Sequence, residues 1–371
     1  MLSLGTASAL GLARFAYGLL LPAMRDDMHW SLVQAGSLTF ANGLGYVAGA
    51  ATAAACIRRW NQAATFRTGM LLIAGSLAAN ALPSYPALFT ARAVAGFAGA
   101  WVFISGGVIA AELAASARLT SPITIYFSGT GAGIIASAVT IPPSLARTAD
   151  SWQAGWVTLA ALAVLAAIIS WPAAGSTDDV GAVALHGPRR VAVLRPISVA
   201  YVLFALGYIA YITFLSAVLL EKRAPTWQVV VTWTVVGLGV IASPALWSRA
   251  IHTWPRAMAL GTILGLLAIA SAVPLLNASS GIVLASAALY GLTFMAVPAA
   301  VTSLIRSRTP PDAWAATLAA FTILFAVGQT LGPLAAGYVA DRSSAAATLA
   351  WTAILCAMAA GVAMTHEWRA R

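Results

Sequence analysis

Two arginines lie inside stretches that are otherwise apolar, and their side chains are the best candidates for chemistry in this chain. Arg14 falls in GLARFAYGLLLP (residues 11–22), and Arg92 falls in LFTARAVAGFAGA (residues 88–100). An α-helix rises about 1.5 Å per residue, so Arg14 would lie about 12 Å along a helix from Pro22. A guanidinium carries five N–H donors in a planar fork that suits a carboxylate or a phosphate. The two arginines therefore favour recognition of an anionic group.

The acidic residues offer these arginines no partner within the apolar stretches. All ten fall in loops or near the ends of apolar segments. An arginine at the centre of a membrane helix costs at least about 2.5 to 3.5 kcal/mol on insertion scales. Two interpretations stay open: a ligand supplies the counter-charge, or helix carbonyls and tyrosine hydroxyls satisfy a structural arginine. The structural interpretation is stronger for Arg92, which lies closer to a helix end.

Further polar and aromatic residues could complete a binding site. Tyr17 follows Arg14 by three residues and so shares its helix face. A helical stripe of residues 201, 204, 208, 211 and 215 is largely aromatic, although such stripes are also typical of packing. Other polar residues deep in apolar segments include Ser128 and Thr130. The predicted substrate-binding residues are Arg14, Tyr17, Asn42, Arg92, Tyr126, Tyr208, Tyr211 and Gln329.

The composition shows what surrounds these residues. Of 371 residues, 61% are hydrophobic and only 8% are charged, whereas about 25% are charged in a typical soluble domain. The mean hydropathy is +0.88. The chain is thus predicted to be an all-α polytopic membrane protein. Its first apolar stretch lacks a basic leading region and is expected to be a retained helix rather than a signal peptide.

Apolar runs of membrane-spanning length divide the chain into twelve predicted spans. The runs lack the alternation of a membrane β-barrel. The predicted spans are residues 2–21, 32–56, 68–82, 87–113, 122–143, 154–173, 197–220, 228–247, 257–276, 281–305, 314–340 and 346–365.

The basic residues predict the orientation. With both termini in the cytoplasm, thirteen basic loop residues lie inside and five lie outside, as the positive-inside rule favours. The polar segment 174–196 contains glycine, proline and charge, and it is expected to be a cytoplasmic linker. It separates a first bundle of six helices (1–173) from a second (197–371).

The two halves resemble each other at a shift of about 194 residues. ARFAY (13–17) aligns with GYIAY (207–211), and GLGYVAG (43–49) aligns with GLGVIAS (237–243). At a slightly larger shift, ITIYF (123–127) aligns with FTILF (321–325). A parallel repeat of this kind predicts a substrate site near the membrane midplane between the halves.

In these features the chain resembles the major facilitator superfamily. LFTARAVAGFAGA is similar to the superfamily's motif B through Leu88, Arg92, Gly96 and Gly99, although Ala95 replaces the usual glutamine. GLARFAYGLLLP, LVQAGSLTFANGLGYVAGA (32–50) and GQTLGPLAAG (328–337) are similar to its bacterial YbfB/YjiJ-like branch. The resemblance implies a twelve-helix transporter that works by alternating access, and it associates Arg92 with proton coupling.

The superfamily's motif A, which follows the second span, is degraded here. Its basic positions have candidates in Arg58 and Arg59, but the aspartate that helps to hold the cytoplasmic gate in the family is missing. Glu112 could replace it by pairing with Arg58 or Arg59 in the outward-open state; the alternative is a solvated carboxylate at a helix end. The degraded motif also favours a rival interpretation, a sensor or an assembly partner that does not transport.

Glycines and prolines predict how the helices pack. Small residues let membrane helices approach closely, and the predicted packing positions are Gly45, Gly49, Gly96, Gly129, Gly133 and Gly332. Pro298 and Pro333 lie inside predicted spans, where each would remove a helical hydrogen bond and favour a kink.

Other functional classes find little support in the residues. No phosphate-binding loop, metal-ligand spacing or Ser/His/acid set is present, and Cys56 and Cys356 are expected to be inert. The net charge of +10 is explained by loop arginines rather than by a nucleic-acid surface. We therefore predict a monomeric secondary transporter of the bacterial inner membrane, not an enzyme, with no cofactor or metal. Its substrate would be a small organic solute: a cationic one is disfavoured, an anionic one is mildly preferred, and neutral sugars and drugs stay open as alternatives. Protons are the expected coupling ion.

Overall fold

A computed structural model of the chain describes residues 1–117, 121–147, 152–175, 190–255, 257–277 and 279–368. Most of the predicted linker 174–196, and several of the loop arginines used to predict orientation, lie outside these residues. Within them the regular structure is entirely helical. The predicted all-α class is confirmed.

The helices follow each other in two sets. The first set consists of α1 (Leu4–Thr6), η1 (Ala7–Phe15), α2 (Tyr17–Asp27), α3 (Leu32–Trp60), α4 (Gln62–Ala79), α5 (Tyr85–Ala117), α6 (Ser121–Arg147) and α7 (Trp152–Ser170). After the short 3-10 turn η2 (Ala173–Gly175), the second set consists of α8 (Arg195–Glu221), α9 (Thr226–Thr253), α10 (Met258–Leu276), α11 (Ser280–Phe294), α12 (Ala296–Arg308), η3 (Pro311–Ala313), α13 (Trp314–Asp341) and α14 (Ala346–Trp368).

Eleven helical segments in the described residues are long and apolar enough to cross a membrane. The predicted third span is the exception, because α4 begins with Gln62 and carries Arg67 in its second turn. This helix still packs against α5 and α7 inside the bundle. The chain is thus a multi-pass membrane protein with two bundles of six helical segments.

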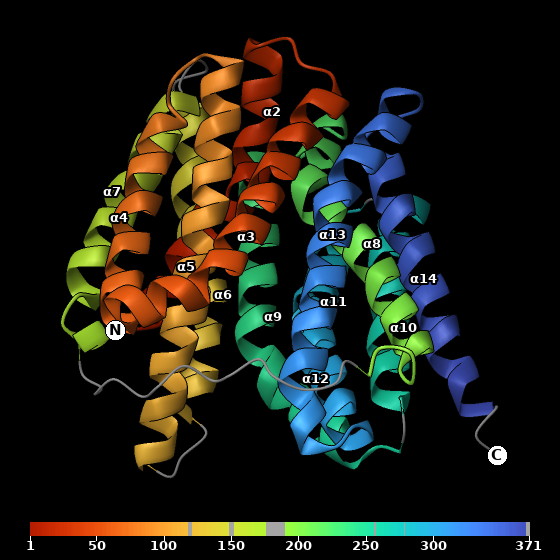
Figure 1. Cartoon of the computed structure of the whole chain (residues 1–371). Coiled ribbons are helices and arrows are strands. Elements are labelled where there is room, and N and C mark those ends of the chain that lie inside the picture. The colour runs from red at the N-terminus through yellow and green to blue at the C-terminus, as the bar shows by residue number, and fades with distance from the viewer. Residues whose placement is uncertain (118–120, 148–151, 176–189, 256, 278, 369–371) are drawn as a thin grey trace.

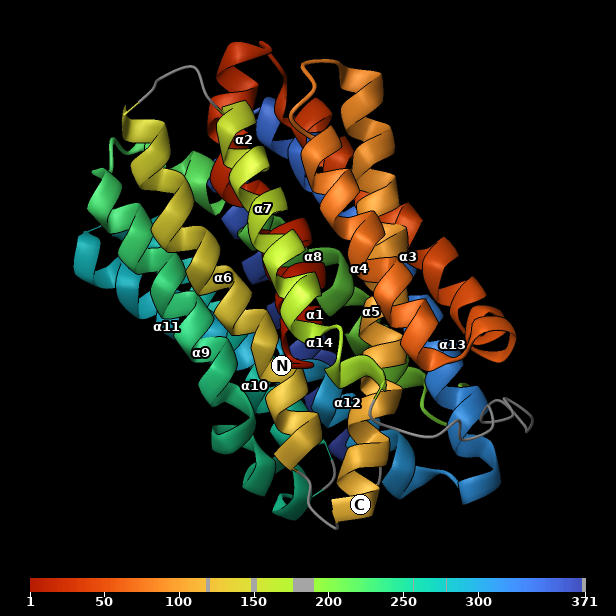
Figure 2. The same cartoon turned by 90° about the vertical axis from the view of Figure 1, so that its left-hand side faces the viewer.

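The two bundles lie side by side, the first in red to yellow and the second in green to blue (Figure 1). We call the end that carries Asp27 and Asp341 the upper end, and the end that carries Trp60 the lower end. The main contacts between the bundles join α3 to α13 and α6 to α9, and α2 packs against α8 (Figure 2). The segment Leu4–Asp27, which contains η1, and the helix α8 are the most buried of the candidate membrane spans, so they lie at the centre of the molecule.

The first membrane segment is an interrupted helix. Residues 7–15 form a π-helix, η1, which joins the α-helical turns α1 and α2. A π-helix is wider than an α-helix and is frequent at functional sites. A Cβ atom on Gly133 of α6 would collide with the backbone of Ala7 in this wider segment, and one on Gly129 would collide with the backbone of Ser3, just before α1. The glycines of α6 therefore make room for the segment that carries Arg14.

The other predicted packing glycines also lie at close helix contacts. A Cβ atom on Gly45 or Gly49 would collide with the backbone of α5, and one on Gly96 would collide with the backbone of α3. In the second bundle, Gly332 of α13 approaches the carbonyl of Leu206 in α8. Each glycine thus allows two backbones to touch, as small residues do in membrane helix pairs.

Of the two prolines predicted to favour a kink, one lies next to a break in its helix and the other does not. The span that contains Pro298 is divided into α11 and α12, with the break at Met295. Proline lacks an N–H to donate to the carbonyl four residues earlier, here Phe294, which is the last residue of α11. Pro333, in contrast, lies within the uninterrupted helix α13.

Candidate substrate site

Three polar side chains meet where the two bundles come together. Arg14 Nη2 donates a hydrogen bond of 2.7 Å to Gln329 Oε1, and the Tyr208 hydroxyl donates one of 3.0 Å to the same oxygen. Arg14 comes from η1, Tyr208 from α8 and Gln329 from α13. The contact therefore joins the first bundle to the second through a single amide oxygen.

This contact leaves several hydrogen-bond donors without an acceptor. Among the described residues, Arg14 Nε and Gln329 Nε2 have no hydrogen-bond partner, although both atoms are buried. The Gln329 side chain is completely buried and that of Arg14 is 7% exposed. A buried donor without a partner costs about 1 to 3 kcal/mol. The site is thus rich in donors and poor in acceptors, as a site for an acceptor-bearing ligand should be.

Aromatic rings surround the three polar groups. The guanidinium of Arg14 lies 5.5 Å from the ring centre of Tyr46 in α3. Tyr208 stacks between Phe204 and Phe294, at centroid distances of 4.8 and 6.1 Å. Phe325 of α13 stacks on Tyr208 at 5.6 Å. These rings hold Tyr208 in place and give Arg14 a π-face in place of a counter-ion.

Arg92 forms a second buried cation close to the first. Its Nη1 donates to the carbonyl of Ala13, the residue before Arg14, and its guanidinium lies 4.7 Å from the Tyr17 ring centre and 5.8 Å from that of Trp156. Arg92 is fully buried, and its Nε and Nη2 have no hydrogen-bond partner among the described residues. Arg92 therefore binds the backbone that positions Arg14.

The remaining predicted binding residues have partners within their own bundles. The hydroxyl of Tyr17 donates to Ala35 O at 2.8 Å, so this residue belongs with Arg92 rather than with Arg14. Asn42 Nδ2 donates to Arg92 O at 3.2 Å. Tyr126 donates to Val102 O at 2.7 Å, and Tyr211 donates to Ser286 Oγ at 2.9 Å. A substrate contact by any of these four stays a prediction.

The predicted gate residues lie at the lower end of the first bundle, and their pairing in the outward-open state stays a prediction. Glu112 Oε2 accepts a hydrogen bond of 2.7 Å from Gln62 Nε2, at the lower end of the first bundle. Arg58 and Arg59 lie in the last turn of α3. The contact of either arginine with Glu112 in the outward-open state is therefore still to be tested.

Sequence reasoning missed several contacts of the site. Tyr46 lies four residues after Asn42 and so on the same helix face, which could have indicated it. Phe294 and Phe325 carry no signal beyond their apolar character, because their role depends on how α11 and α13 pack against α8. The repeat did indicate Tyr208, which aligns with Arg14 at the shift of 194 residues and reaches the same oxygen.

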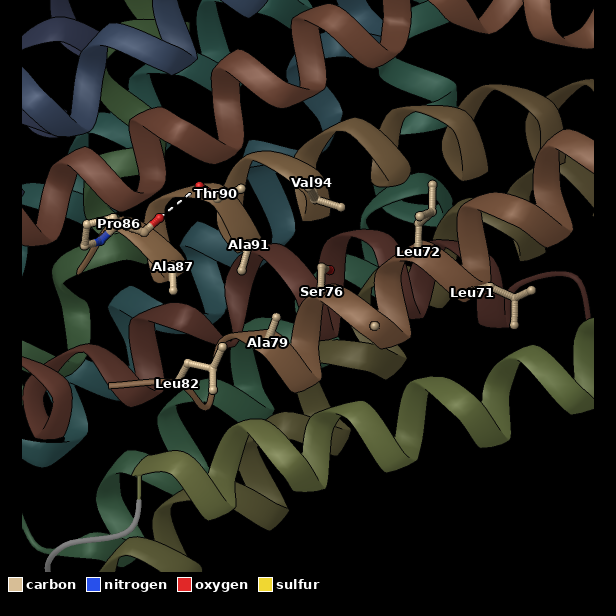
Figure 3. A pocket seen from close by; sticks show the side chains of 11 residues that line it. Leu71, Leu72, Ser76, Ala79, Leu82, Pro86, Ala87, Thr90, Ala91 and Val94 are labelled. Atoms are coloured by element: carbon tan, nitrogen blue, oxygen red, sulfur yellow. Dashed lines mark hydrogen bonds between the residues drawn. The ribbon is translucent and has the colours of Figure 1, made fainter. Parts of the chain in front are cut away.

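A pocket of about 590 Å³ lies elsewhere, on the outer face of the first bundle between α4 and α5 (Figure 3). It is lined mainly by small and aliphatic side chains, and the Thr90 hydroxyl donates to Pro86 O at its edge. Leu71 and Leu82 at its rim are 56% and 52% exposed. This pocket belongs to the apolar outer surface and contains none of the predicted site residues.

Comparison with known proteins agrees with this architecture. Residues 6–365 match the family model described as "Uncharacterised MFS-type transporter YbfB". No curated protein matches the chain.

Solved structures share the fold at low sequence identity. A D-xylose–proton symporter has a TM-score of 0.74 at 14% identity, with 98% of this chain and 95% of that chain covered. The nucleoside transporter NupG has a TM-score of 0.70 at 14% identity, covering 98% and 96%. The human organic anion transporter MFSD10 has a TM-score of 0.63 at 15% identity, covering 97% and 98%. With a family match over nearly its whole length, the chain belongs to the YbfB-like family of transporters within the major facilitator superfamily.

Proposed function

We propose that this protein is a secondary active transporter of a small organic solute with an anionic group, and that Arg14 binds that group. The observation that carries the proposal is the meeting of Arg14, Gln329 and Tyr208 between the two bundles. Arg14 Nε and Gln329 Nε2 are buried there and have no partner in the part of the chain that the structure describes. A carboxylate has two acceptor oxygens and a negative charge. It would supply the acceptors and the counter-charge that the described site lacks.

The charge of the site supports an anion over a cation. Arg14 and Arg92 are both buried near Ala13. Among the described acidic residues, each lies at or near the end of a helix, as Asp27, Glu112 and Asp341 illustrate. A cationic solute would meet two positive charges in this region and no carboxylate from these residues.

Matched ligands test the substrate class. We would measure thermal shifts of the purified protein with three pairs: benzoate and benzamide, lactate and lactamide, gluconate and glucose. We expect at least one acid to raise the melting temperature while its neutral partner does not. A shift by neutral members alone would overturn the anionic preference. Counterflow of the responding acid in proteoliposomes would then separate a transporter from a sensor, which binds without exchange.

We further propose that transport takes place in the bacterial inner membrane and is coupled to protons. Moving one negative charge inward against a potential of 100 mV costs about 2.3 kcal/mol, and one accompanying proton removes this electrical cost. Uptake of the responding acid into proteoliposomes should therefore follow an imposed pH gradient and stop with a protonophore. Uptake that follows the membrane potential and ignores the pH gradient would contradict proton coupling.

A further inference from the structure

The orientation of the Gln329 amide follows from its two neighbours. A guanidinium has donors but no acceptor, so the atom that faces Arg14 Nη2 at 2.7 Å must be the amide oxygen. The same oxygen also receives the Tyr208 hydroxyl at 3.0 Å. Both acceptor positions of the oxygen are thus filled, while the amide nitrogen finds no partner among the described residues.

A neutral amide oxygen is a weak partner for a buried guanidinium. A bond from a guanidinium to an amide oxygen has one ionised partner, whereas a carboxylate adds the opposite charge and can bind an arginine through two parallel bonds. Here the cation has one bond to a neutral oxygen and a tyrosine ring at 5.5 Å. An incoming carboxylate would therefore displace the amide oxygen from Arg14.

We propose that Gln329 is an internal substitute for the substrate's anionic group: it fills the acceptor position on Arg14 in the empty transporter and yields it to the bound carboxylate. This proposal deepens the proposed function and depends on it. Gln329 is then a specificity-determining residue. A ligand must bind Arg14 better than a neutral amide does, which an anion can do and a neutral carbonyl compound cannot.

The same exchange links binding to the two bundles. Arg14 belongs to η1 in the first bundle and Gln329 to α13 in the second, so their hydrogen bond is a direct tie between the bundles. A carboxylate that displaces Gln329 breaks this tie and replaces it with a bridge through the ligand. Through Gln329, the hydrogen bonding between the two bundles thus differs between the empty and the substrate-bound transporter.

Gln329→Glu tests the proposal because glutamate has nearly the same shape as glutamine and places a carboxylate next to Arg14 at all times. We expect this variant to melt at a higher temperature than the wild type, since Arg14 gains a counter-charge. Binding of the acid that responds in the wild type should weaken at least tenfold, because its position is already occupied. The control is Gln228→Glu, a buried glutamine in α9 whose Oε1 accepts from Ser280 and does not contact Arg14. That variant should bind the acid as the wild type does.

A double variant tests whether Arg14 is the cause. In the Arg14→Gln background, Gln329→Glu should lower the melting temperature, because the new carboxylate is buried without a cation. If the single variant unfolds, if its gain in stability persists without Arg14, or if it binds the acid like the wild type, the proposal is wrong. A wild type that responds to no acid would instead contradict the proposed function itself.

Discussion

Arg14 is surrounded by groups that bind a cation only weakly. Its described contacts are one amide oxygen and the face of Tyr46, whereas a structural arginine in a membrane interior usually pairs with acids or with several carbonyls. We expect an arginine held in this way to contribute little to stability, since the desolvation of a buried charge costs several kcal/mol and no counter-charge among the described residues offsets it. Its presence is better explained by binding.

Two substitutions at Arg14 separate binding from stability. Arg14→Lys keeps the charge but loses the planar fork, so we expect carboxylate binding to weaken at least tenfold while the protein still folds. Arg14→Met removes the charge, and we expect the melting temperature to stay equal or to rise while binding is lost. Thermal stability and acid binding should be measured on both variants. Loss of folded protein for Met, or normal binding for Lys, would show that Arg14 is structural.

For Arg92, the stabilising contacts and the desolvation penalty are of similar size. A desolvated cation–π contact contributes about 2 kcal/mol and a hydrogen bond from a charged group about 1.5 to 3 kcal/mol, against a desolvation penalty of several kcal/mol. We therefore expect Arg92→Met to change the free energy of unfolding by no more than about 1 kcal/mol. Counterflow of the responding acid should be strongly reduced in this variant, because Arg92 holds the carbonyl next to Arg14. Normal counterflow with lowered stability would assign Arg92 to the structure alone.

At the scale of the helix, hydropathy predicted the position of each span but not its end. The predicted spans 32–56, 87–113 and 228–247 end four to six residues too early, since α3, α5 and α9 continue to Trp60, Ala117 and Thr253. The backbone hydrogen bonds of a helix can continue beyond the membrane. Hydropathy does not report these bonds, so it does not predict where the helix ends. The π-helix was also not predicted, because its register depends on contacts with α6 and on Arg92 rather than on its own residues.

Gly133 provides a test of that dependence. A Cβ atom at this position would collide with Ala7 O, and overpacking of this kind costs typically 1 to 3 kcal/mol. We expect Gly133→Ala to lower the melting temperature and to weaken acid binding, because η1 must shift. The matched control is Gly75→Ala in α4, where nothing lies within 4 Å of the added Cβ atom. That change should leave the protein unaffected or stabilise it by up to about 1 kcal/mol. Equal stability of the two variants would show that the close contact is unimportant.

For the whole molecule, the internal repeat explains why the bundles meet where they do. Gly43 of α3 packs on Thr330 of α13, and Gly237 of α9, its counterpart at the shift of 194 residues, packs on Gly131 of α6. The sequence thus predicted a site between the halves and named Arg14, Tyr208 and Gln329 among its residues. It could not predict that Gln329 accepts from both of the others, since that contact depends on how α13 packs against η1 and α8.

The orientation of the molecule in the membrane is open to direct test. The count of basic residues predicts that both termini and the 174–196 segment lie in the cytoplasm. Fusions of a reporter that is active only in the cytoplasm, made at Gly175 and at Arg371, should both be active. A reporter that is active only in the periplasm serves as the reciprocal control. Activity of that second reporter at either site would reverse the assignment, and with it the side to which the upper end faces.

A carboxylate joins the two bundles at the upper end. Asp341, the last residue of α13, accepts the backbone N–H groups of Leu32 and Val33 at 2.6 and 2.9 Å, so it caps the first turn of α3 from the other bundle. The capping box of Ser31 and Gln34 satisfies the neighbouring N–H groups. Opening the upper end would separate Asp341 from α3 and leave two amides of that helix without their acceptor.

Asp341→Asn should therefore favour opening at the upper end. Asparagine has one acceptor oxygen and no charge, so we expect to lose about 1 kcal/mol of capping, a shift of roughly fivefold in the balance between closed and open forms. The readout is the rate at which a thiol reagent labels Ala35→Cys, a fully buried position near the start of α3, in a background that lacks the two native cysteines. The control is Asp26→Asn, an exposed acid at the same end, which should not alter labelling. If Asp341→Asn labels no faster than its parent, the cap does not hold the upper end closed.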